Sequence, residues 1–100
     1  MAQFRTLTPN FTVSTMVEHG ALSFFLDDEL KFSGTDFQNS QKMVLEPGDH
    51  TFQWQVNGQQ EITRYSIRLL LNGTPIPATA VGPRTLQSGN TDFDGGTFTV

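Results

Sequence analysis

The sequence contains no cysteine, and this absence excludes both a disulfide framework and a thiolate zinc site. Basic residues are also scarce, because six Lys and Arg stand against ten Asp and Glu and give a formal net charge of −4. Binding to the phosphates of nucleic acid needs a basic surface, so we expect no nucleic-acid partner. The same charge balance disfavours attachment to an anionic membrane surface.

The sequence also has no long apolar run. No segment reaches the roughly 20 apolar residues that a membrane-spanning helix needs, so we expect no membrane insertion. The first residues, Met1-Ala2-Gln3-Phe4-Arg5, lack the apolar centre of a signal peptide. We therefore expect either a cytoplasmic protein or a mature or excised domain, and the sequence leaves both alternatives open.

Aromatic residues are plentiful in comparison, with nine Phe, one Trp and one Tyr among 100 residues. Apolar residues make up 36% of the chain, which is enough for a small core and argues against disorder. Bulky rings pack well on pleated strands. We expect a single all-β domain over residues 1–100, with residues 1–9 as a lead-in segment.

The clearest alternation of apolar and polar residues lies between residues 43 and 71. One run has a largely apolar residue at every second position: His50, Phe52, Trp54 and Val56. This period of two predicts a half-buried strand. Pro47-Gly48 suits a type II turn, which predicts that residues 43–45 pair back onto the strand.

A second hairpin is predicted from the loop at residues 58–61, which would place Trp54 opposite Tyr65. A slip of one residue would move every large side chain to the wrong face. Trp54 and Tyr65 share the apolar face, so burial is a better interpretation than a sugar-stacking platform. The other face offers Gln53, Gln55, Arg64 and Arg68. These four residues form either a ligand-binding surface or an ordinary solvated sheet face.

The remaining predicted strands are short. They cover residues 11–17, 21–26, 30–32 and 97–100, while residues 75–81 form an edge strand or an irregular segment. Turns are predicted at His19-Gly20 and Asp27-Asp28-Glu29, and a loop at residues 33–41 from which Phe37 packs onto the core. Seven to eight short antiparallel strands at this spacing predict an immunoglobulin-like β-sandwich, with a small barrel as the alternative.

No catalytic residues are predicted. A hydrolytic triad needs a histidine base, and only His19 and His50 are available. His50 lies on an apolar strand face and His19 precedes a glycine, so both are interpreted as structural. The sequence has no Gly-x-Ser-x-Gly elbow and no phosphate-binding loop. We therefore expect a protein that is not an enzyme.

One acidic motif could bind a metal. Asp92-Phe93-Asp94-Gly95 resembles the opening of a calcium loop, since alternating carboxylates can direct oxygens toward one hard cation. The ligands would be Asp92, Asp94 and Asn90. The later ligands of a complete loop are missing, and ordinary acidic turns explain the same residues.

The central part of the chain carries two turn motifs. Leu22, Phe24 and Leu26 precede Asp27-Asp28, and Leu45-Glu46-Pro47-Gly48-Asp49-His50 is followed by Gly58. Residues 22–58 thereby resemble the small PEGA-like β-domains of bacterial surface proteins, although Asp28 stands where those domains have glycine. The resemblance implies a non-enzymatic, extracytoplasmic accessory or adhesive module.

These observations favour a non-catalytic module that binds carbohydrate or protein at a bacterial cell surface or after secretion. The alternative is a structural or assembly subunit, or a spacer, that forms a homo-oligomer by pairing its sheet edges. A cytoplasmic location stays open.

Overall fold

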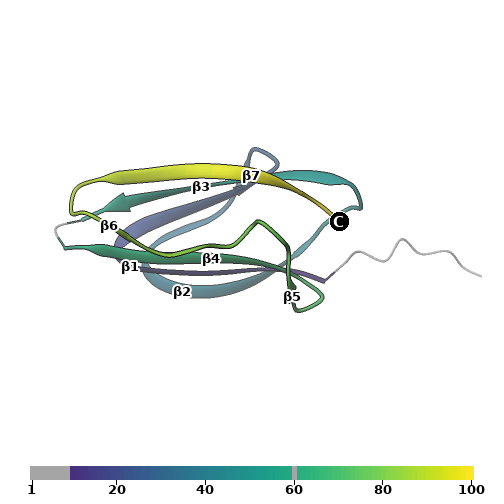
Figure 1. Ribbon diagram of the computed structural model, residues 1–100, viewed down its shortest axis with the longest axis horizontal. Coiled ribbons are helices and arrows are strands. Elements are labelled where there is room, and N and C mark those ends of the chain that lie inside the picture. The colour runs from purple at the N-terminus through teal and green to yellow at the C-terminus, as the bar shows by residue number, and fades with distance from the viewer. Residues whose placement is uncertain (1–9, 60) are drawn as a thin grey trace, which may run out of the picture.

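The computed structural model describes residues 10–59 and 61–100, and the predicted lead-in at residues 1–9 lies outside them (Figure 1). Within these ranges the chain forms strands and no helix, so no helix there could cross a membrane. The strands are β1 (Asn10–Leu26), β2 (Glu29–Val44), β3 (Asp49–Gly58), β4 (Thr63–Leu71), β5 (Thr74–Pro75), β6 (Val81–Leu86) and β7 (Thr91–Thr99). All their pairings are antiparallel, which confirms the all-β antiparallel prediction.

β1 contributes to both sides of the core because it changes its inward face near the middle. Every second residue is buried, at odd positions up to Val17 and at even positions from Gly20 onward. The change comes from a bulge at His19, whose φ of 59° is left-handed, opposite Asp36 of β2. An extra residue in one strand of a pair bends that strand and increases its twist. The bulge therefore makes one 17-residue strand part of two layers.

The neighbours of β1 follow its two halves. β2 pairs along nearly the whole of one side, while β4 pairs with residues 11–18 and β3 with residues 20–26 on the other side. β7 adds to β3, and β5 and β6 add to β4. The described residues thus form one seven-stranded sheet curled into a half-barrel. β3 and β7 lie on one side of it and β4 and β6 on the other (Figure 1).

The core fills the space between these two sides. Trp54 of β3 and Tyr65 of β4 are both buried, and their ring centroids lie 5.4 Å apart although the two strands do not pair. Phe24 stacks on Phe32 and Phe52, with centroids 5.4 and 6.5 Å away. Full burial of a large apolar side chain stabilises a fold by roughly 1.5–3 kcal/mol. Packing across the half-barrel therefore replaces the disulfides that the chain lacks.

Both predicted hairpins between residues 43 and 71 are wrong. Residues 43 and 44 pair with β1 rather than β3, and β3 and β4 pair with different halves of β1 rather than with each other. Gly48 does have the positive φ of the predicted turn, at 125°, but the turn joins strands that are not neighbours. Alternation determines which face of a strand is buried and does not determine which strand lies beside it. Trp54 and Tyr65 consequently meet across the core.

Two further predictions are corrected by β1 and β2. Residues 33–41 form the middle of β2 and not a loop, and His19-Gly20 is a bulge and not a turn. The polar residues of β2 lie on an edge strand with one solvated face, so their composition resembles that of a loop. Phe37 packs against the core as expected, edge to face with Phe32 at a centroid distance of 6.2 Å.

Candidate functional site

β7 forms one edge of the sheet and is longer than the sequence predicts. It begins at Thr91 rather than at Thr97, and it pairs with β3 over nine residues without a register shift. Within the described part of the chain, β7 pairs with no other strand. One full edge of this strand is therefore open.

The hydrogen bonds at the two ends of β7 show which backbone groups are free. Val100 and Gly48 exchange two bonds of 3.0 and 2.9 Å, and the carbonyl of Asn90 accepts from the amide of Gly58 at 2.7 Å. In an antiparallel pair, such bonded positions alternate with positions that point away from the partner strand. Even-numbered residues of β7 therefore bond to β3. The open edge presents the amides and carbonyls of Thr91, Phe93, Gly95, Thr97 and Thr99.

An exposed aromatic ring and a hollow lie on the outer face of β7 and β3, close to this edge. Phe93 is 75% exposed and stands opposite Gln55 of β3, and Gly95 stands opposite Gln53. Around Gly95 and Gly96 there is a hollow of about 450 Å³, which Phe93 and Gln53 also line. This volume lies within the range of small ligand-binding pockets. The edge thus combines free backbone groups with room for a side chain.

The two glycines allow β7 to approach β3 closely. A Cβ atom on Gly95 would lie 2.4 Å from the carbonyl oxygen of Phe52, and one on Gly96 would lie 3.0 Å from the Phe52 ring. Larger residues at either position would collide with β3. The lack of side chains at Gly95 and Gly96 therefore accounts both for the hollow and for the close approach of β7 to β3.

Two carboxylates adjoin Phe93 in the sequence and lie on the opposite face of β7. Asp94 Oδ1 accepts a hydrogen bond of 2.8 Å from the amide of Gly95, which caps one donor of the open edge. Asp92 accepts from the Tyr65 hydroxyl and lies 3.9 Å from the Arg84 guanidinium. Burial, and then the bond to Asp92, raises the pKa of Tyr65 to about 12. The Tyr65 hydroxyl is therefore a donor at neutral pH, and Asp94 is the carboxylate with fewer partners.

The predicted calcium ligands lie close in sequence but have other partners. Asp92 is bound by Tyr65, Asp94 caps a backbone amide, and the carbonyl of Asn90 bonds to Gly58. Among residues 10–59 and 61–100, no three His, Cys, Asp or Glu side chains gather where they could hold a metal ion. The calcium site stays a prediction to which the structure adds no ligand.

The four predicted ligand-binding residues do not form one surface. Gln53 and Gln55 lie on the outer face of β3 beside β7, whereas Arg64 and Arg68 lie on β4 at the other side of the core. The Arg68 guanidinium donates to the carbonyls of Ile67, Val81 and Gly82 at 3.0, 2.8 and 2.7 Å. Arg68 thereby holds the start of β6. Of the four, only the two glutamines lie beside β7, on the strand that pairs with it.

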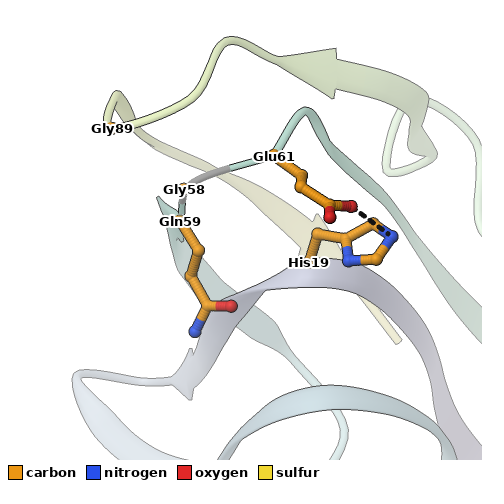
Figure 2. A pocket seen from close by; sticks show the side chains of 5 residues that line it. All are labelled: His19, Gly58, Gln59, Glu61 and Gly89. Carbon is orange, nitrogen blue, oxygen red and sulfur yellow. Dashed lines mark ion pairs between the residues drawn. The ribbon is translucent and has the colours of Figure 1, made fainter.

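A pocket of about 590 Å³ lies beside the β1 bulge (Figure 2). It is lined by His19, Gly58, Gln59, Glu61 and Gly89, and His19 Nε2 lies 3.2 Å from Glu61 Oε2. Both of these side chains are more than half exposed. None of the described residues that line it carries a hydroxyl or thiol nucleophile that the histidine could activate.

His50 joins three segments at one end of the half-barrel. Its Nδ1 lies 2.7 Å from Asp27 Oδ2, and its Nε2 lies 2.7 Å from the carbonyl oxygen of Glu46. A carboxylate and a carbonyl only accept, so both ring nitrogens donate and the charged imidazolium is favoured. The side chain is 11% exposed and stacks on Phe98 with centroids 5.6 Å apart. We call this arrangement of His50, Asp27 and Glu46 the histidine clamp.

We expect the histidine clamp to stabilise the fold most between about pH 4 and pH 6.5. The hydrogen bond with Asp27 raises the pKa of His50, so its contribution is complete below the unfolded value of about 6.5 and is lost as the pH rises through the folded-state pKa. The bond from His50 lowers the pKa of Asp27, whose contribution is present above about pH 4 and is lost as the pH falls through its folded-state pKa. The urea midpoint measured against pH checks this profile.

Two histidine variants make the pH experiment specific. In the wild type the urea midpoint should fall above pH 6.5, and His50→Gln should make this fall smaller. His19→Gln removes a histidine that is 54% exposed and lies outside the histidine clamp, so it should keep the decline. An equal fall of the urea midpoint in the wild type and in His50→Gln would contradict the stabilising role of the histidine clamp.

No family model, curated protein or solved structure matches the chain. The candidate site therefore follows from geometry alone, and the open edge of β7 is its centre. Phe93 is the residue of this site that the sequence interpretation missed, although it alternates with Asp92 and Asp94 as a strand residue would.

Proposed function

We propose that the protein is a non-catalytic binding module that takes an extended segment of another protein as an added strand along β7. An unpaired edge offers a row of backbone donors and acceptors, and a hollow beside it can select a side chain. The observation that carries the proposal is the character of this edge. β7 runs for nine residues with no bulge, no proline and no basic residue.

The other open edges contain features that hinder strand addition. β2 has an extra, unpaired residue at Lys31, between its pairs with Phe24 and Phe25 of β1, and it also carries Lys42. β5 is two residues long and includes Pro75, and β6 includes Pro83. Among the described strands, β7 is the one edge without any of these features, which favours it as the place of contact.

Thr97→Pro is expected to abolish strand addition and to leave the fold intact. The Thr97 amide faces the open edge, so proline removes a donor that the added strand needs. Proline is tolerated on an edge strand where its nitrogen faces solvent. Peptides selected from a random phage-displayed library on the wild type should bind Thr97→Pro at least about tenfold more weakly in titrations.

Thr97→Val is the matched variant, because it loses the hydroxyl and keeps the amide. Equal loss of binding in Thr97→Val and Thr97→Pro would overturn strand addition, and so would selected peptides that bind Thr97→Pro as tightly as the wild type. Amide exchange gives a second measurement. The amides of Phe93 and Thr97 should exchange quickly in the free protein and slowly in the complex.

Carbohydrate is the second candidate ligand, and the exposed ring of Phe93 favours it. A flat ring can cover the apolar face of a pyranose, while the amides of Gln53 and Gln55 can bond its hydroxyl groups. A glycan array distinguishes the two ligands. Glycan binding that Phe93→Ala abolishes and Thr97→Pro retains would favour carbohydrate over an added strand.

The resemblance of residues 22–58 to PEGA-like domains supports a place at a bacterial cell surface, where the module would act as an accessory or adhesive domain. The two opposed sides of the half-barrel support an immunoglobulin-like sandwich as the finer description of the fold. Self-association through β7 is the weaker alternative. A second copy would bring to this edge another strand with two carboxylates and no basic residue.

A further inference from the structure

The two faces of β7 carry different chemistry. Phe93 and Gly95 lie on the outward face with the hollow, and Asp92 and Asp94 alternate onto the other face, with Asp94 also bordering the hollow. Side chains of an added strand alternate between the same two faces. We infer that the segment bound by β7 alternates Lys or Arg with apolar residues, an inference that rests on the proposed function.

Asp94 is the residue that would recognise the basic side chain. It is exposed, and its Oδ1 accepts a bond of 2.8 Å from the amide of Gly95. An added strand supplies a backbone carbonyl to that amide and releases the carboxylate toward the incoming cation. The exchange leaves no donor unpaired. Asp92 is less available, because it is bound by Tyr65 and lies near Arg84.

Charge argues against a second copy of the chain in this position. β7 contains no Lys or Arg, so a copy paired edge to edge would offer Asp94 no cation. Like charges on neighbouring strands are unfavourable, and a formal net charge of −4 on each chain adds to the repulsion. A basic and apolar segment of another protein satisfies both faces of β7.

Three synthetic peptides test the inference, and each is nine residues long, which is the length of β7. They alternate valine with lysine, with serine or with glutamate, and calorimetric titration measures their binding at low and at high salt. At low salt the lysine peptide should bind about two- to fivefold more tightly than the serine peptide, and the glutamate peptide most weakly. The differences should shrink at high salt, because salt screens exposed charges.

Asp94→Asn should bring the lysine and serine peptides to equal affinity. Asp28→Asn makes the same change of charge in the exposed β1–β2 turn, at a φ of 63° that Asn also tolerates, and should keep the preference. Equal binding of the lysine and glutamate peptides to the wild type would overturn the inference. If Thr97→Pro still abolished the binding of both of these peptides, the proposal of strand addition would stand. Failure of all three peptides to bind the wild type would overturn both the inferred basic and apolar pattern and the proposal of strand addition.

Discussion

Trp54→Ala is expected to lower the free energy of unfolding by about 3–5 kcal/mol, as truncations of buried aromatic residues do. The Trp54 side chain is 2% exposed, and its ring lies 5.4 Å from that of Tyr65. The Arg84 guanidinium lies over the same ring, 5.5 Å from its centroid. Loss of the indole would open a cavity where β3 meets β4 without any hydrogen bonds between them. Urea denaturation followed by circular dichroism measures the change.

Phe93→Ala is the matched control, since it truncates an aromatic residue on the neighbouring strand that is 75% exposed. Its cost should stay within about 0.5 kcal/mol, as is usual for surface positions. A Trp54→Ala variant as stable as Phe93→Ala would contradict the burial of Trp54 in the core. The contrast also decides which of the two aromatic residues is available to a ligand, and their exposures favour Phe93.

The sequence predicts burial well because burial depends on a local period. Most of the residues that alternation assigns to one face are buried, namely Phe52, Trp54, Val56, Tyr65 and Ile67, while His50 of the same run is partly buried. The predicted turn at Asp27-Asp28 also holds, with positive φ at both residues, and Gly48 has the positive φ expected of it. Both properties are determined by residues that adjoin one another in the chain.

Strand neighbours are harder to predict, and the bulge of β1 shows why. A change of parity between Val17 and Leu22 fits two strands joined by a turn as well as one strand with a bulge at His19. Both alternatives place a residue with positive φ before Gly20. The choice depends on β2, β3 and β4, whose pairings with β1 connect residues distant in sequence.

The candidate site follows from the sequence only in part. Gln53 and Gln55 are exposed as predicted, whereas the guanidinium of Arg68 is taken up by backbone carbonyls. The sequence does not predict the first part of β7, because two adjacent glycines, Gly95 and Gly96, are typical of a turn. Gly96 also stands where an apolar residue is expected on the inward face of the strand. The ring of Phe52 fills that place from the neighbouring strand.

Gly95→Ala is expected to cost about 1–3 kcal/mol of stability, in the range of overpacked positions. The new Cβ would lie 2.4 Å from the carbonyl oxygen of Phe52 and 3.2 Å from the Cα of Gln53. These are backbone atoms of β3 that cannot rotate away, so β7 has to move off its neighbour. Urea denaturation gives the cost, and amide exchange of Asp94 and Gly96 should accelerate, because their bonds to β3 lengthen.

Gly34→Ala makes the same substitution on β2 against a different obstacle. Its Cβ would lie 3.1 Å from the ring of Phe37, a side chain that can shift. We therefore expect a cost below about 1 kcal/mol. A larger cost for Gly34→Ala than for Gly95→Ala would contradict the close approach of β7 to β3. The hollow beside Phe93 depends on the same glycines, so that outcome would also remove the pocket on which the proposed recognition by the β7 edge depends.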